Sequence, residues 1–198
     1  MPPLDGESMN KPALRAVLCT IAALAAGATH AQTPGKSPLD DIHAVELDID
    51  HDGKPDNARL VRNRDSNELD LVIEPSSWNS NPLMSRRLAF TKEAIASSLV
   101  LEFAAQGKGS LVITTGCGGC SNDVSTTLTI VYRSGTFVVA GYTLAWDTRS
   151  GSGTCDVNFL TGKGTLARDG GKARPLKSRF LPIKLKDWSS EKRPSACE

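Results

Sequence analysis

The sequence has few aromatic residues, few histidines and almost no net charge. Only 5% of its 198 residues are Phe, Trp or Tyr, three are histidines, and the formal net charge is +1. Balanced charge gives no general argument for a nucleic-acid partner. The low aromatic content and the 17 glycines favour short strands joined by turns. The length is enough for one domain with a sizeable core.

Sequence motifs of common enzyme classes are also missing. The chain contains no G-x-S-x-G elbow, no H-E-x-x-H helix motif and no glycine-rich phosphate loop. Beyond the N-terminal segment only His43 and His51 remain, and neither has a recognisable serine or cysteine nucleophile beside it. The carboxylate pairs of glycosidases are set by spatial distance, so the sequence alone leaves them open. The sequence therefore predicts a protein that is not an enzyme.

The N-terminal segment has the pattern of an export signal. Two basic residues precede an apolar run at 16–26, and small residues lead to Ala31. This is typical of a cleaved signal peptide over residues 1–31, with Met9 as an alternative start. The apolar run is too short to span a bilayer, and Cys19 follows a leucine where a lipoprotein signal needs a small residue. We expect the mature protein in the periplasm or outside the cell.

One acidic stretch has the spacing of a calcium loop. Asp48, Asp50, Asp52 and Asp56 occupy positions 1, 3, 5 and 9, with Gly53 at position 6 and the carbonyl of Lys54 at position 7. Carboxylates this close repel one another unless a cation offsets the repulsion. Ca²⁺ takes six to eight oxygen ligands at roughly 2.3–2.6 Å, which this spacing can supply. These four aspartates and the Lys54 carbonyl are the predicted Ca²⁺ ligands; a solvated acidic turn is the alternative.

The loop differs from an EF-hand at its C-terminal end. An EF-hand has a bidentate Glu at position 12, where this chain has Arg59. Pro55 disfavours passage into a helix because it lacks a backbone donor and restricts the residue before it. The sequence therefore predicts a short calcium loop between two strands, at 44–47 and 58–62.

The remaining chain reads as a series of strands with turn residues between them. Residues 32–43 are predicted to be a flexible leader and 44–198 a single domain. Residues 83–98 are ambiguous: 87–90 could form a strand, and 91–96 have an N-cap candidate and helix-forming residues for only about one helical turn. Further strands are predicted at 68–74, 99–104, 110–115, 124–133, 136–146, 154–160, 165–168 and 179–185. The expected fold is an all-β antiparallel meander with minimal helix, either like a propeller blade or a small sandwich.

Four cysteines remain after the predicted signal peptide: Cys117, Cys120, Cys155 and Cys197. An even number in an oxidising compartment favours two disulfides over a zinc site or a redox C-x-x-C pair. Alternate connections of an antiparallel meander lie at the same end of the sheet. That places the loops 116–123 and 147–153 near the C-terminal tail. We therefore predict that Cys117 and Cys120 each bond to a distant partner, one to Cys155 and the other to Cys197.

The C-terminal part of the chain is basic. Residues 163–193 contain ten Lys or Arg against three Asp or Glu. The excess could contact an anionic partner. It is also typical of exposed edge strands, which use lysine to discourage pairing with other sheets, and this interpretation is favoured.

The calcium loop, together with the aliphatic strand at 57–61, resembles a single unit of FG-GAP/VCBS-type repeat proteins. The runs 131–142 and 157–163 resemble a group of small exported bacterial proteins in which one calcium loop precedes a β-meander. Because the sequence has one such loop, it excludes a propeller of repeats. Some proteins of this group are periplasmic immunity proteins, which inhibit peptidoglycan-hydrolase effectors.

The resemblance implies that a loop at one end of the sheet plugs the cleft of the hydrolase. The matching loop here is 116–123, with the candidate partner-binding residues Gly118, Gly119, Ser121 and Asn122. The alternative is a structural or accessory calcium-binding module of the bacterial envelope without inhibitory activity.

Overall fold

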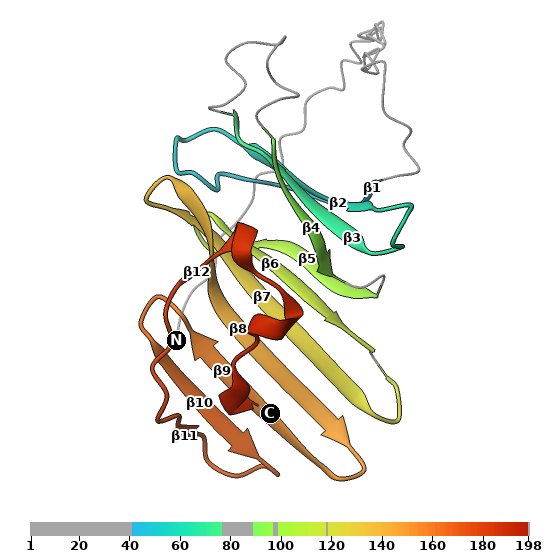
Figure 1. Cartoon of the computed structure of the whole chain (residues 1–198), viewed down its shortest axis with the longest axis vertical. Helices are drawn as coiled ribbons and strands as arrows, with labels where there is room; N and C mark the ends of the chain where they lie inside the picture. Colours follow the sequence, from blue (N-terminus) through green and yellow to red (C-terminus); the bar gives the residue numbers. More distant parts are fainter. Residues whose placement is uncertain (1–40, 77–88, 97–98, 118, 198) are drawn as a thin grey trace, which may run out of the picture. The chain divides into compact units, whose positions relative to one another are not determined.

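The structure is a computed structural model that describes residues 41–76, 89–96, 99–117 and 119–197 (Figure 1). Within these residues the protein is built from antiparallel strands and short 3-10 helices, so the all-β meander is confirmed. The predicted signal peptide lies outside the described residues. No helix in the part described is both long and apolar enough to cross a bilayer.

The first sheet has four strands in chain order. They are β1 (Asp41–Leu47), β2 (Asp56–Arg62), β3 (Leu69–Glu74) and β4 (Phe90–Ala96). β1 begins inside the segment predicted to be a flexible leader. The helical turn predicted at 91–96 is wrong, because these residues form β4 and pair with β3. A single helical turn has little stability of its own, so pairing with a neighbouring strand overrides a weak local preference.

The second sheet is larger and also keeps the order of the chain. Its path is β5 (Val100–Gln106), β6 (Ser110–Gly116), β7 (Asp123–Arg133), β8 (Thr136–Thr148), β9 (Gly151–Asn158), β10 (Lys163–Arg168) and β11 (Arg174–Pro175). The long strand predicted at 179–185 is reduced to β12 (Ile183–Lys184), which pairs with β8. Pro182 directly precedes β12 and has no N–H to donate to a ladder.

Both sheets contribute to one hydrophobic cluster. In β3 the alternation of the sequence is reproduced, because Leu69, Leu71 and Ile73 are fully buried while the residues between them are half-buried. The second sheet contributes buried residues that include Leu111, Ile113, Ile130, Val139 and Tyr142.

The C-terminal segment covers part of the second sheet with three short 3-10 helices. These are η3 (Leu185–Asp187), η4 (Ser190–Lys192) and η5 (Ser195–Cys197), drawn in red in Figure 1. Leu185 is fully buried, and the Trp188 ring lies 6.0 Å from that of Tyr142 in β8. The hydrophobic contact of Trp188 with the sheet anchors a segment that has little regular structure.

The disulfides differ from the predicted long-range pairing. Cys117 bonds to Cys120, and Cys155 bonds to Cys197, with Cα atoms 5.6 and 5.5 Å apart. Cys155 lies inside β9, two strands away from β7. Neighbouring strands are roughly 4.8 Å apart, so the β6–β7 loop is about 10 Å from β9 in the plane of the sheet, too far for a bridge. The order of antiparallel strands predicts the end of the sheet at which a loop lies. It does not predict how far that loop is from another strand, measured across the sheet.

Candidate metal site

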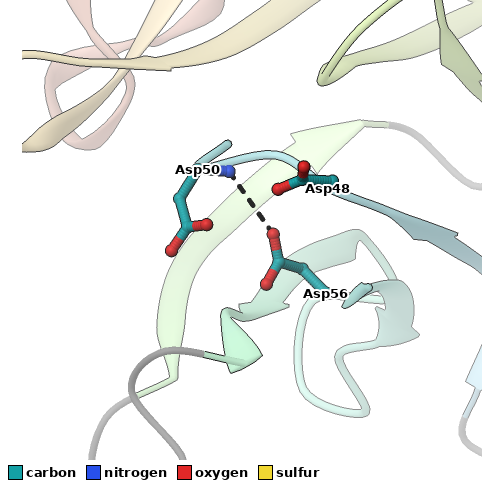
Figure 2. A group of neighbouring side chains, drawn as sticks. All are labelled: Asp48, Asp50 and Asp56. Atoms are coloured by element: carbon teal, nitrogen blue, oxygen red, sulfur yellow. Dashed lines mark hydrogen bonds between the residues drawn. The ribbon is translucent and has the colours of Figure 1, made fainter. Parts of the chain in front are cut away.

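The calcium-loop residues are brought together by the pairing of β1 and β2. Leu47, the last residue of β1, is directly opposite Asp56, the first residue of β2. The intervening loop therefore starts and ends on the same rung of the sheet. Carboxylate oxygens of Asp48, Asp50 and Asp56 lie within 4.8 Å of one another (Figure 2). Gly53 turns the chain with φ of 82°, as the loop pattern predicts.

Asp56 is the most buried of the three, with 1% of its surface exposed. Its Oδ2 accepts hydrogen bonds from the N–H of Ile49 (2.7 Å) and of Asp50 (3.4 Å), and the second of these is drawn in Figure 2. Its Oδ1 accepts the N–H of Ser76 (2.6 Å). Three backbone donors thus hold the carboxylate in one orientation while it stays close to Asp48 and Asp50.

Asp48 is held from one side only. Its Oδ2 accepts the N–H of Gly53 at 3.1 Å. Its Oδ1 is buried and has no hydrogen-bond partner among the residues that the structure describes. A buried acceptor without a donor costs about 1–3 kcal/mol, and a cation between the carboxylates would remove that cost. Hard carboxylate oxygens are the ligands that Ca²⁺ and Mg²⁺ take, so this group of residues could hold such an ion.

The other two predicted ligands are not part of the carboxylate group. Asp52 is exposed, and its Oδ1 accepts the N–H of Lys54 at 2.8 Å. Its Oδ2 lies 3.3 Å from the hydroxyl of Ser76, which donates to it. Lys54 is exposed as well. Asp52 and the Lys54 carbonyl stay predicted ligands, and Arg59 at position 12 instead pairs with Glu74 at 2.8 Å.

Two residues of the site have no signal in the sequence. Ser76 comes shortly after β3 and donates to both Asp52 and Asp56, at separations of 24 and 20 residues. Gly109 ends the turn between β5 and β6, and a Cβ at that position would lie 2.5 Å from the backbone oxygen of Asp48 and from the His51 ring. No local pattern identifies either residue, because each acts through a contact with a distant part of the chain. The metal loop, which is the segment between β1 and β2 that carries Asp48, Asp50 and His51, is therefore in contact with the β5–β6 turn of the second sheet.

We predict that Gly109→Ala destabilises the protein more than Gly107→Ala does. Both glycines have positive φ (74° and 58°), so both substitutions carry the same kind of backbone strain. A Cβ at Gly107 meets nothing within 4 Å, whereas one at Gly109 overlaps the metal loop. Overpacking of this kind costs about 1–3 kcal/mol. Urea unfolding of the two variants measures the difference, and equal losses of stability would show that the turn does not contact the loop.

The predicted partner-binding loop lies between β6 and β7. Gly119, Ser121 and Asn122 are exposed, and the N–H of Gly119 donates to Asp123 at 3.3 Å. Gly118, the fourth predicted contact residue, lies outside the described residues. The Cys117–Cys120 bond closes the loop on itself. The loop is thus accessible to a partner and limited in its conformations.

Comparison with known proteins gives no relative from which to transfer a function. The chain matches no family model, no curated protein and no solved structure. The metal loop and the exposed β6–β7 loop are therefore the features from which a function can be argued.

Proposed function

We propose that this protein is an exported calcium-binding protein that acts by binding another protein. The observation that carries the proposal is the group of Asp48, Asp50 and Asp56 carboxylates within 4.8 Å, with the buried Oδ1 of Asp48 lacking a donor among the described residues. Ca²⁺ suits such a loop because it accepts many oxygen ligands in flexible geometry. The two disulfides support an oxidising location such as the periplasm.

The proposed role of the ion is structural. It would neutralise the aspartates and fix the loop that joins β1 to β2. The same loop receives Ser76 from the end of β3 and contacts Gly109 in the β5–β6 turn. Calcium binding would therefore tie together parts of the chain that are far apart in sequence. Asp48, Asp50, Asp52, Asp56 and the Lys54 carbonyl are the proposed ligands.

The proposed binding surface is the β6–β7 loop. Its disulfide restricts the loop before a partner arrives, so less conformational entropy is lost on docking. Ser121 and Asn122 are exposed and offer hydrogen-bonding groups, and Gly118 and Gly119 would allow close approach of the backbone.

A peptidoglycan hydrolase is the proposed partner. The support is the resemblance of the calcium loop and the meander after it to periplasmic immunity proteins. The alternative is a structural or accessory calcium-binding module of the envelope. A periplasmic pull-down in calcium, repeated with chelator, distinguishes the two: a captured hydrolase whose lysis of cell walls is inhibited supports the first. Capture without inhibition supports the second.

We expect Ser121→Arg combined with Asn122→Arg to weaken binding of the captured partner by at least roughly tenfold, because bulky charges at the centre of a contact cannot be desolvated cheaply. Ser134→Arg is the matched control, since Ser134 is an exposed residue of the β7–β8 turn at the opposite end of β7. Affinities come from surface plasmon resonance on variants that melt like the wild type. Unchanged affinity of the double variant would exclude this loop as the contact.

A further inference from the structure

The β10–β11 hairpin forms a groove lined by positive charge. Its volume is about 630 Å³, and it lies far in sequence from the metal loop. Three basic side chains line it, Arg168, Lys172 and Arg174, and the apolar lining comes from Leu166, Pro175 and Leu176. Cations of the basic C-terminal stretch are therefore gathered around one apolar hollow.

The register of the sheet explains how these cations come together. Arg168 and Leu166 are two residues apart in β10, so their side chains are on the same face. Arg174 in β11 is directly opposite Leu166 and shares that face. Lys172 comes from the turn between the two strands. The two guanidinium groups consequently flank Leu166.

Arg168 is held in place by an aromatic ring. Its guanidinium carbon lies 5.7 Å from the ring centroid of Trp146, in the geometry of a cation–π contact. Gly153 in β9 is directly opposite Trp146 of β8 on one side and Arg168 of β10 on the other. A Cβ at Gly153 would overlap the indole ring, so the glycine provides the space in which Trp146 lies toward Arg168. The orientation of this cation is therefore built into the sheet.

No anionic side chain of the described part of the chain neutralises the groove. Arg168, Lys172 and Arg174 form no ion pair with any described carboxylate. Asp169, next to Arg168 in sequence, accepts the N–H of Ser152 at 3.1 Å. Arg174 lies in β11 at the edge of the sheet, but Arg168 lies in β10 and contacts the Trp146 ring, so protection of an edge strand does not account for the whole arrangement.

We propose that this groove binds a phosphate group attached to an apolar or carbon-rich body. Two guanidinium groups offer forked donors to phosphate oxygens, and the lysine adds a third positive charge. A phosphate monoester carries nearly two negative charges near neutral pH, which matches three cations better than the single charge of a carboxylate does. The apolar lining accommodates the body to which the phosphate is attached. This proposal does not depend on the calcium site or on the protein partner.

The phosphate could belong to a small soluble compound or to a lipid head group, and two probes separate these sources. The first is glycerol 3-phosphate in titration calorimetry at low ionic strength. The second is sedimentation with vesicles of phosphatidic acid in phosphatidylcholine, compared with phosphatidylcholine alone. Binding in the calorimeter alone indicates a soluble ligand, and binding to the acidic vesicles indicates a head group. Binding to neither probe overturns the proposal.

Matched variants locate the site. Arg168→Gln combined with Arg174→Gln should weaken the observed binding by at least about tenfold, because both sets of charged, forked donors to the phosphate oxygens are lost. Lys186→Gln combined with Lys192→Gln removes the same charge from exposed positions outside the groove and should change binding by less than about twofold. Equal losses in both pairs would show non-specific attraction and overturn the site.

Lys172→Gln keeps the test valid if the arginine variants fail to fold. Lys172 is exposed in a turn and lies outside the buried core. The variant should melt like the wild type and weaken phosphate binding severalfold. Unchanged phosphate binding by Lys172→Gln would contradict the assignment.

Discussion

Asp48→Asn and Asp56→Asn should change the stability of the calcium-free protein in opposite directions, although both should abolish calcium binding. The two substitutions remove the same charge from the same carboxylate group. They differ in the surroundings of the two oxygens of each side chain. The contrast therefore separates the hydrogen-bonding role of each aspartate from its role toward a cation.

Asp56→Asn should destabilise the calcium-free protein. Both oxygens of Asp56 accept backbone N–H groups, Oδ1 from Ser76 and Oδ2 from Ile49 and Asp50. The side chain of asparagine has one oxygen and one NH₂ group. At position 56 the NH₂ group would therefore point at a backbone N–H, so that two hydrogen-bond donors would face each other. Leaving a buried donor unsatisfied costs about 1–3 kcal/mol, more than the relief of charge repulsion returns.

Asp48→Asn should stabilise the calcium-free protein by on the order of 1 kcal/mol. The oxygen of the asparagine can still accept the N–H of Gly53. Its NH₂ group takes the place of Oδ1, which is buried and accepts no hydrogen bond from the described residues. The substitution also removes one negative charge from the group that Asp48 forms with Asp50 and Asp56.

Thermal melting in chelator and in excess calcium reads out both effects. Asp65→Asn is the control, because Asp65 is an exposed aspartate of the β2–β3 turn outside the group. We expect the control to keep the full calcium-induced rise in melting temperature and both site variants to lose it. A calcium-induced rise in Asp48→Asn equal to that of the wild type would remove Asp48 from the site.

The two disulfides should contribute unequally to stability. The Cys155–Cys197 bond closes a loop of 42 residues, whereas Cys117 and Cys120 are separated by three. In the chain-entropy model the longer loop gives about 4 kcal/mol of stabilisation and the shorter about 2 kcal/mol. The long-range bond also fastens the C-terminal segment, whose Leu185 and Trp188 are buried against the sheet. Its loss should therefore have the larger effect.

Paired alanine substitutions test this order without placing a hydroxyl in the core, where Cys155 and Cys197 are both buried. The variant that lacks Cys155 and Cys197 should melt on the order of 10 °C below the wild type, and the variant that lacks Cys117 and Cys120 roughly half as far below. Peptide mapping of the wild-type protein without reduction identifies the bonds directly. A peptide that joins Cys117 or Cys120 to Cys197 would contradict the pairing of the structure.

The sequence predicts best those features that depend on neighbouring residues. The spacing from Asp48 to Asp56 identified the acidic loop because its members are close along the chain. The strand predicted at 68–74 depends on neighbouring residues in the same way, because turn residues bound it. The helix-forming residues at 91–96 gave a wrong prediction, since pairing with β3 decided their structure.

Features that depend on register could not be predicted. Ser76 and Gly109 reach the metal loop only after several strands have paired. The basic stretch is visible as composition, but its groove depends on the pairing that places Arg174 of β11 opposite Leu166 of β10. The predicted partner of Cys155 is wrong because the distance from Cys155 to the β6–β7 loop is measured across strands, and no spacing along the chain gives that distance.

The most direct test of the calcium site is a titration of Ca²⁺ into the metal-free wild-type protein, with a melting curve recorded at each concentration. We expect one bound ion per chain. At a free calcium concentration about a hundredfold above Kd, binding should add roughly 2.7 kcal/mol, which corresponds to a rise of about 5–10 °C in melting temperature. No heat of binding and the same melting temperature in calcium and in chelator would contradict the calcium site.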